Sequence, residues 1–219
     1  MSLPSSRPWT VIVPVKASVR AKSRIRLDPA VRRTLALIMA EDTVSAIVGA
    51  APVGRTLVVL EDPRDGTTLA RVPGVDLFVT RTNELNAAIR DGLAALDRDG
   101  VGPVAVVPAD LPSLTSVELA DALTRAAAHP RSVVADRAGT GTTMLAAQSS
   151  ELLDPRYGAD SFLAHVAGGA VPLDLPGRSG LRRDVDRVDN LRSVTGPRTR
   201  AILQLLAWPP PVGPEFAGG

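Results

Sequence analysis

Hydrophobic residues along this chain occur in short runs of adjacent apolar positions, and such runs predict strands buried on both faces of a sheet. One run, Val104–Val107, is followed by Asp110 and then by Pro112. The predicted strands are Thr10–Val15, Thr56–Leu60, Val75–Val79, Val104–Val107 and Ser132–Ala135, with Thr143–Ala147 as a further strand and Val171–Leu175 as a late edge strand.

Segments in which apolar residues recur at helical spacing lie between these runs. The first begins at Asp28-Pro29, an N-cap followed by a first-turn proline, and Leu35 and Met39 continue its apolar face. The alternation predicts an α/β domain with a mostly parallel sheet and helices on both faces. The other predicted helices are a short one up to Val72, Asn83–Leu96, Ser116–Ala128, Ser161–Ala167 and one or two short ones within Val188–Leu206.

The length of 219 residues suits one domain, predicted over residues 10–207, between a flexible N-terminus at residues 1–9 and a disordered Pro/Gly-rich tail at residues 208–219. No segment is apolar enough to span a membrane, and the N-terminus lacks a signal-peptide core. We therefore expect a cytoplasmic protein without a membrane partner. The pattern does not specify an oligomeric state.

Charge and composition exclude several kinds of chemistry. The net charge is only +2, the arginines are interleaved with acids and aromatics make up 3%, which argues against a nucleic-acid partner. The absence of cysteine excludes thiolate metal sites and cysteine nucleophiles. The two histidines, His129 and His165, lie far apart in the chain and neither has metal-ligand spacing.

Several polar segments follow predicted strands, where open α/β sheets bind ligands. Asp110 offers a hard oxygen ligand for magnesium, or it caps the turn before the next helix. The basic loop Lys16–Leu27 lacks the glycine patterns of dinucleotide and P-loop sites, so its Lys and Arg side chains either hold phosphates or are simply solvated.

Three later segments have the same ambiguity. The glycines of Asp136–Thr143 allow an anion cradle, although their spacing favours a hairpin turn. Tyr157–Ser161 opens a helix and offers an anion site, or its Asp160 or Ser161 is only the N-cap. Asp184 and Asp186 alternate along an extended segment and suit a shared cation, with a helix N-cap as the rival role for Asp186.

Together, acids, a basic loop and two anion cradles without a catalytic histidine, cysteine or serine triad favour phosphoryl or nucleotidyl transfer. Such transfer depends on positioning and charge neutralisation. A phosphate monoester that attacks in it is already largely ionised at pH 7, since its second pKa is about 6, and it needs no general base.

The motifs VIVPVK, KSRIRL, ELNAAI, VVPADLPSL, DRAGTGTT, YGADSF and GLRRDVD occur in this order. The chain thereby resembles, from about Thr10 to Leu191, the 2-phospho-L-lactate guanylyltransferase family with its bacterial phosphoenolpyruvate guanylyltransferase branch, which acts in coenzyme F420 biosynthesis. The resemblance implies a nucleotidyltransferase-type three-layer α/β/α fold, similar to nucleotide-diphospho-sugar transferases, with a mostly parallel mixed sheet. It also implies GTP as co-substrate, Mg²⁺ as cofactor and transfer of GMP to the phosphate of phosphoenolpyruvate or 2-phospho-L-lactate with release of pyrophosphate.

The resemblance also implies roles for particular residues. Metal ligands would be Asp110, Asp184 and Asp186; acceptor contacts would be Thr142, Gly158 and Ser161; nucleotide contacts would be Lys16, Lys22, Arg24 and Asn86; and the catalytic groups would be Asp110, Lys22 and Arg24. The family's usual KTRL and FGPDS are KSRI and YGADS here, so no charged group is lost. The alternatives are a nucleotidyltransferase of the same fold for a molybdenum cofactor or a sugar phosphate, and a non-catalytic GTP-binding module.

Overall fold

The computed structural model describes residues 7–17, 28–96 and 102–206. Its strands are β1 (Trp9–Val15), β2 (Val53–Leu60), β3 (Val75–Val79), β4 (Val104–Val106), β5 (Arg131–Ala135), β6 (Thr142–Ala147) and β7 (Val171–Pro172). Its α-helices are α1 (Pro29–Val48), α2 (Gly66–Leu69), α3 (Leu85–Leu96), α4 (Ser116–Ala126), α5 (Ser161–Ala167), α6 (Val188–Leu191) and α7 (Pro197–Leu205). Short 3-10 helices are η1 (Pro63–Asp65), η3 (Ser150–Leu152) and η4 (Gly180–Arg182).

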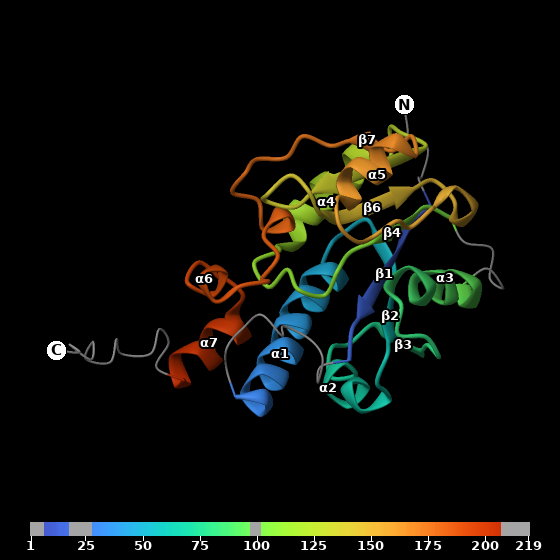
Figure 1. Ribbon diagram of the computed structural model, residues 1–219. Helices are drawn as coiled ribbons and strands as arrows, with labels where there is room; N and C mark the ends of the chain where they lie inside the picture. Colours follow the sequence, from blue (N-terminus) through green and yellow to red (C-terminus); the bar gives the residue numbers. More distant parts are fainter. Residues whose placement is uncertain (1–6, 18–27, 97–101, 207–219) are drawn as a thin grey trace.

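The strands form one seven-stranded sheet in the order β3-β2-β1-β4-β6-β5-β7 (Figure 1). Strands β1, β2, β3 and β4 are parallel, whereas β6 runs antiparallel to both β4 and β5. The sheet is therefore mostly parallel but mixed, as the sequence predicts. Its carboxyl edge collects the ends of β1 to β5 and the start of β6, which is where ligands of such sheets bind.

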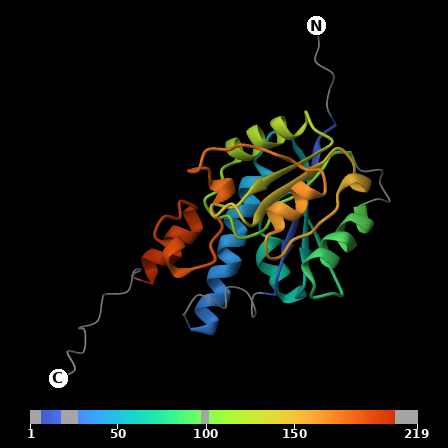
Figure 2. The same ribbon diagram turned by 45° about the horizontal axis from the view of Figure 1, so that its top comes forward.

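Helices cover both faces of the sheet, which makes three layers (Figure 2). On one face, Val44 of α1, Leu69 of α2 and Leu123 of α4 share a buried apolar cluster with the strands. On the other face, Ile89 of α3 packs in a second cluster against which Phe162 of α5 lies. Strands β1 to β6 therefore contribute apolar side chains to both cores, which explains the continuous apolar runs in the sequence.

The C-terminal helices α6 and α7 pack against α1 and away from the sheet (Figure 1). Buried Asp42 of α1 accepts the backbone N–H groups of Arg198 and Thr199 at 3.1 and 2.8 Å and so satisfies the first turn of α7. Gly196, just before that turn, is required by close packing, since a Cβ there would lie 2.1 Å from the carbonyl oxygen of Pro112. The C-terminal segment thus lies directly on the loop that carries Asp110.

Some predicted boundaries differ from the observed ones. Strand β7 covers Val171–Pro172 and not Val171–Leu175, because Pro172 cannot donate to a neighbouring strand and Pro176 follows closely. Strand β1 begins at Trp9, which is buried and lies inside the segment predicted to be flexible. In the described part of the chain, no helix is long and apolar enough to cross a membrane.

Candidate active site at the carboxyl edge of the sheet

The edge where the parallel strands end gathers polar residues from widely separated parts of the chain. Lys16 follows β1 and is exposed, Glu61 follows β2, and Asp110 lies beyond β4. Asp136 follows β5, and Thr142 opens the antiparallel strand β6 at the same edge. Lys16, Asp110 and Thr142, which the sequence analysis named as candidates, therefore lie at the same edge of the sheet.

Contacts to the main chain fix the loop around Asp110. Buried Thr43 of α1 accepts the Leu111 N–H at 3.1 Å, and its hydroxyl lies 3.1 Å from the carbonyl oxygen of Ala109. The residues on both sides of Asp110 are therefore held by one side chain. The N-cap of α4 is Thr115, which accepts the Glu118 N–H. The turn-capping role considered for Asp110 stays a prediction, as does its role as a metal ligand.

The segment with Asp184 and Asp186 runs beside this loop. Between them, Val185 is buried and its N–H donates to the carbonyl oxygen of Asp110 at 3.0 Å. Both aspartates line a cavity of about 650 Å³, which Val185 between them also borders. Helix α6 takes Arg187 as its N-cap, so the rival role of Asp186 as a helix cap is not observed.

The guanidinium of Arg182 also fixes this segment. It donates to the carbonyl oxygens of Ala135, Asp136 and Leu175 at 3.3, 3.1 and 3.1 Å. Asp136 lines the same cavity as Asp184 and Asp186. The acidic segment is thereby joined to the end of β5.

The residues present suit a hard divalent cation, although they do not enclose one alone. Asp110, Asp184 and Asp186 supply the carboxylate oxygens that magnesium prefers. Among the described residues, no three or more His, Cys, Asp or Glu side chains converge in a ready-made metal cluster. This donor set fits a magnesium ion that takes one or two carboxylates and completes its octahedron with water and substrate phosphates.

The two predicted anion cradles also lie together. Residues between β5 and β6 form a hairpin turn, with Gly139 at φ +81°, so the hairpin alternative is correct for their backbone. The carbonyl oxygen of Thr140 in this hairpin accepts the N–H of Phe162 in α5 at 3.0 Å. This bond places the hairpin against the start of α5. Thr142 and Ser161, which are both predicted to contact the acceptor, therefore lie on adjoining segments.

The YGADS segment turns sharply before α5. Gly158 has φ +148° and Asp160 has φ +52°, which is uncommon for a residue other than glycine. Asp160 is the N-cap residue of α5, which confirms one of the two predicted candidates, although its side chain makes no capping hydrogen bond. Ser161 is buried as the first helical residue.

Asn86 holds this segment from helix α3. Its side-chain amide donates to the Tyr157 carbonyl oxygen at 2.9 Å and accepts the Tyr157 N–H at 2.8 Å. The hydroxyl of Tyr157 donates to the carbonyl oxygen of Val106 at 3.4 Å, and burial raises its pKa well above the usual range. The predicted nucleotide contact of Asn86 stays a prediction, and what the structure adds is its bond to the acceptor-side loop.

Sequence reasoning missed His165, which is 3% exposed. Its Nδ1 lies 2.9 Å from the hydroxyl oxygen of Thr142, and its Nε2 accepts the N–H of Arg156 at 2.9 Å. Burial lowers the pKa of His165 to about 4. The available signal was helical spacing, because His165 follows Ser161 by one turn and shares its face of α5.

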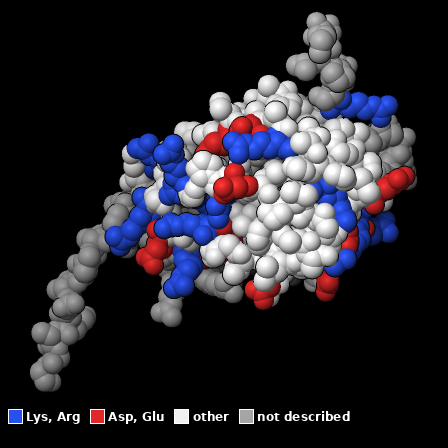
Figure 3. Space-filling model, turned by 90° about the horizontal axis from the view of Figure 1, so that it is seen from above, with Lys and Arg blue, Asp and Glu red and all other residues white. Residues whose placement is uncertain are grey.

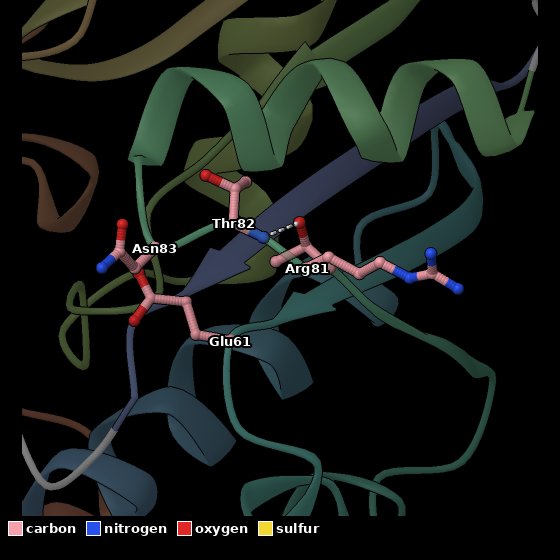
Figure 4. Close-up of a pocket in the computed structure, with 5 residues that line it drawn as sticks. Glu61, Arg81, Thr82 and Asn83 are labelled. Atoms are coloured by element: carbon pink, nitrogen blue, oxygen red, sulfur yellow. Dashed lines mark hydrogen bonds between the residues drawn. The ribbon is translucent and has the colours of Figure 1, made fainter.

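The loop after β1 is held by a second residue that the sequence did not single out. Glu61 accepts the N–H of Ala17 at 2.8 Å, next to Lys16. Glu61 also lines a cavity of about 390 Å³ with Thr82 and Asn83, and Figure 4 shows the Arg81 side chain extending away from Glu61. Lys22 and Arg24 of the same predicted site lie outside the described residues.

Charge on the surface follows the sequence pattern. Figure 3 shows Lys and Arg side chains with Asp and Glu beside them over part of one face, next to a broad area without charged groups. The cavity of about 650 Å³ is likewise lined by both signs of charge, because Arg137, Arg183 and Arg187 border it together with aspartates. Such a lining suits the binding of both a cation and phosphates.

The three-layer fold with polar groups at the carboxyl edge defines the nucleotidyltransferase-type α/β class. A Desulfovibrio desulfuricans protein provisionally named a nucleotide-diphospho-sugar transferase shares this fold, with a TM-score of 0.68 at 14% identity over 92% of this chain and 96% of that one. A Mycobacterium tuberculosis protein solved in complex with manganese shares the fold as well. Its TM-score is 0.58 at 17% identity, and the match covers 87% of this chain and 98% of that one.

Sequence comparison narrows the class to one family. The family model described as "Guanylyl transferase CofC like" matches residues 9–170. A phosphoenolpyruvate guanylyltransferase from Streptomyces scabiei is 46% identical over 213 residues, which cover 92% of this chain and 98% of that protein. The chain belongs to the CofC-like guanylyl transferase family, and the resemblance drawn from its motifs is confirmed.

Proposed function

We propose that this protein transfers GMP from GTP to the phosphate of phosphoenolpyruvate and releases pyrophosphate. The product is enolpyruvoyl-2-diphospho-5'-guanosine, a precursor in coenzyme F420 biosynthesis. Family membership and the name of the Streptomyces relative support this activity. The observation that carries it is the hydrogen bond from Val185 to the Asp110 carbonyl oxygen, which brings both predicted metal-ligand segments to one edge of the sheet.

On the metal side, Asp110, Asp184 and Asp186 would hold Mg²⁺. Support comes from their shared edge and from the cavity that Asp184 and Asp186 line together. A bound magnesium ion would neutralise charge on the phosphates of GTP. The protein's part would be to hold the two segments that carry these carboxylates side by side at the sheet edge, through the Val185 N–H bond to the Asp110 carbonyl oxygen.

On the nucleotide side, Lys16, Lys22 and Arg24 would contact the GTP phosphates and Asn86 the base or sugar. Glu61 supports this assignment for Lys16, because its bond to the Ala17 N–H fixes the start of the loop. Asp110, Lys22 and Arg24 would be the catalytic groups. Lys22 and Arg24 would balance the negative charge that develops on the α-phosphate and on the leaving pyrophosphate, and Asp110 would act through the metal ion that it holds.

On the acceptor side, Thr142, Gly158 and Ser161 would bind phosphoenolpyruvate. The contact between Thr140 and Phe162 supports this set, since it places the hairpin against the start of α5. An oxygen of the acceptor's phosphate attacks the α-phosphorus of GTP. The new oxygen–phosphorus bond forms as the bond to the bridging oxygen of the β-phosphate breaks, and pyrophosphate leaves with that oxygen. No proton has to be removed from the attacking phosphate.

The decisive experiment incubates the purified protein with GTP, Mg²⁺ and one of three acids: phosphoenolpyruvate, 2-phospho-L-lactate or 3-phosphoglycerate. Mass spectrometry of the nucleotide product reads the adduct directly, and released pyrophosphate is measured in parallel. We expect the phosphoenolpyruvate adduct to dominate. The 2-phospho-L-lactate adduct as the main product would reassign the acceptor. No adduct with any of the three acids would refute the proposed function.

A further inference from the structure

His165 is a buried side chain to which the proposed reaction assigns no role. It lies in α5 one turn after Ser161, and its ring and that of Tyr157 form a T-shaped pair with 5.2 Å between ring centroids. Its two nitrogens contact two segments of the acceptor side, namely Thr142 at the start of β6 and Arg156 just before YGADS. A single imidazole therefore connects the hairpin, the loop and the helix.

The partners of the ring determine which nitrogen carries the hydrogen. The N–H of Arg156 is a main-chain group and can only donate, so the Nε2 that it contacts at 2.9 Å must be an unprotonated acceptor. A neutral imidazole then has its hydrogen on Nδ1. That hydrogen lies between the hydroxyl oxygen of Thr142, 2.9 Å from Nδ1, and the backbone of Ser161 one turn earlier in α5.

This tautomer also determines what Thr142 can do. Because its oxygen accepts a hydrogen bond from His165, its own hydroxyl hydrogen must be directed elsewhere. Among the described residues, none accepts that hydrogen, and Thr142 lies at the carboxyl edge of the sheet. Thr142 thus offers a hydrogen-bond donor on the acceptor side of the site.

We propose that His165 is a positioning residue that makes the Thr142 hydroxyl a donor toward the anionic oxygens of the acceptor. This inference rests on the proposed function, because it takes Thr142 as an acceptor contact. A hydroxyl that can only donate binds a phosphate or carboxylate oxygen. It disfavours a ligand that presents a hydrogen-bond donor at the same position. His165 itself does not touch the acceptor, so its effect passes through Thr142.

Two substitutions separate the two nitrogens. In His165→Asn, the side-chain amide nitrogen replaces Nδ1 and can still donate to Thr142, whereas in His165→Gln the side-chain oxygen replaces Nε2 and can only accept from Arg156. We expect the KM for phosphoenolpyruvate to rise about tenfold or more in His165→Gln and less than about threefold in His165→Asn. The KM for GTP stays unchanged in both variants.

The same pair in a Thr142→Val background tests whether the effect passes through Thr142. There, we expect the two His165 variants to have equal KM values for phosphoenolpyruvate, because no hydroxyl remains to be oriented. A merely structural role would instead affect both variants alike in either background. Equal KM values with Thr142 present, or a difference that persists in Thr142→Val, would overturn the inference.

Nitrogen-15 NMR of the imidazoles provides a readout that needs no turnover. The sequence has two histidines, so the spectrum of His165→Asn assigns the signals of His165. We expect hydrogen on Nδ1, an unprotonated Nε2, and a shift of the Nδ1 signal on titration with phosphoenolpyruvate alone. Hydrogen on Nε2 overturns the inference, whereas a wild-type protein that shows the expected tautomer but forms no adduct refutes only the proposed function.

Discussion

The two sides of the candidate site are built in different ways. On the metal side, Thr43 and Val185 contact the main chain around Asp110, through Ala109 O, Leu111 N and Asp110 O. On the acceptor side, the side chains of Asn86 and His165 hold the loop, and His165 also bonds directly to Thr142. The first arrangement fixes a backbone, and the second fixes a hydrogen-bonding direction.

This difference matches the chemistry proposed for each side. A cation bound by carboxylates and phosphate oxygens needs negative charge at a suitable distance, and carboxylates can adjust to it by one or two torsions. A small anionic acceptor must present one oxygen to phosphorus, so donors with fixed directions have the larger effect on its orientation. Neutral buried groups can supply such directions without the desolvation cost of a buried charge.

The strongest test of the metal side is Asp110→Asn. The substitution keeps size and main-chain contacts but removes a charge that the proposed Mg²⁺ requires. Since a bound metal contributes several kcal/mol to charge stabilisation, we expect kcat to fall by about three orders of magnitude with an unchanged melting temperature. Pyrophosphate release at saturating GTP, phosphoenolpyruvate and Mg²⁺ measures the effect.

The matched control is Asp189→Asn, which removes a carboxylate from the lining of the cavity beside Asp184 and Asp186 but not from the predicted ligand set. Its kcat should stay within about twofold of the wild type, as is usual for an exposed substitution. Equal losses in both variants would indicate that the cavity responds to total charge and that Asp110 has no special role.

The fold and the larger part of the predicted site can be derived from local signals. Apolar runs end at the sheet edge. The first polar groups after these runs include the acids Asp110 and Asp136, and the glycines after Asp136 lead to Thr142. The supporting residues are different, because their meaning depends on partners far away in the chain: Asn86 lies 71 residues from Tyr157, and Thr43 lies 68 residues from Leu111. Nothing in the local pattern around either residue indicates these partners.

The next test uses the burial of His165 and concerns the acceptor side. Burial lowers the pKa of His165 to about 4; nearby Arg156 lowers this pKa as well, while Asp154 raises it. The unfolded chain therefore takes up a proton near pH 6.5, whereas the folded protein does so only near pH 4. Stability from the neutral ring is complete above pH 6.5 and is lost as the pH falls toward 4, by about 3 kcal/mol in total.

Urea unfolding at several pH values between 4 and 7 measures this loss. In His165→Asn, the contribution of His165 to the pH dependence of the unfolding free energy should disappear. The matched control is His129→Asn, which replaces the other histidine. A His165→Asn variant whose unfolding free energy has the wild-type pH dependence would contradict a neutral, buried His165.

A smaller effect is expected from the support beneath Asp110. Thr43→Val removes the hydroxyl that accepts the buried Leu111 N–H, and an unsatisfied buried donor costs about 1–3 kcal/mol of unfolding free energy. We also expect a lower kcat, because the backbone beside Asp110 loses its fixed position.

The control is Thr34→Val on the exposed side of α1. The Thr34 hydroxyl only donates to the Ala30 carbonyl oxygen within the helix, so its loss should change the unfolding free energy by less than about 0.5 kcal/mol. Equal stability losses in the two variants would exclude a special role for Thr43.

The smallest expected effect distinguishes two roles for Asn86. If its main role is to hold Tyr157, Asn86→Ala loosens the loop before Ser161 and raises the KM for phosphoenolpyruvate by about tenfold, while the KM for GTP stays unchanged. If it contacts the nucleotide, as the resemblance implies, the KM for GTP rises instead. Gln148→Ala is the control, because Gln148 likewise bonds a main-chain carbonyl, that of Ala126, but follows β6 at the opposite edge of the sheet. A rise in both KM values would mean that one amide serves both substrates, and Asn86 would then connect the two sides of the site.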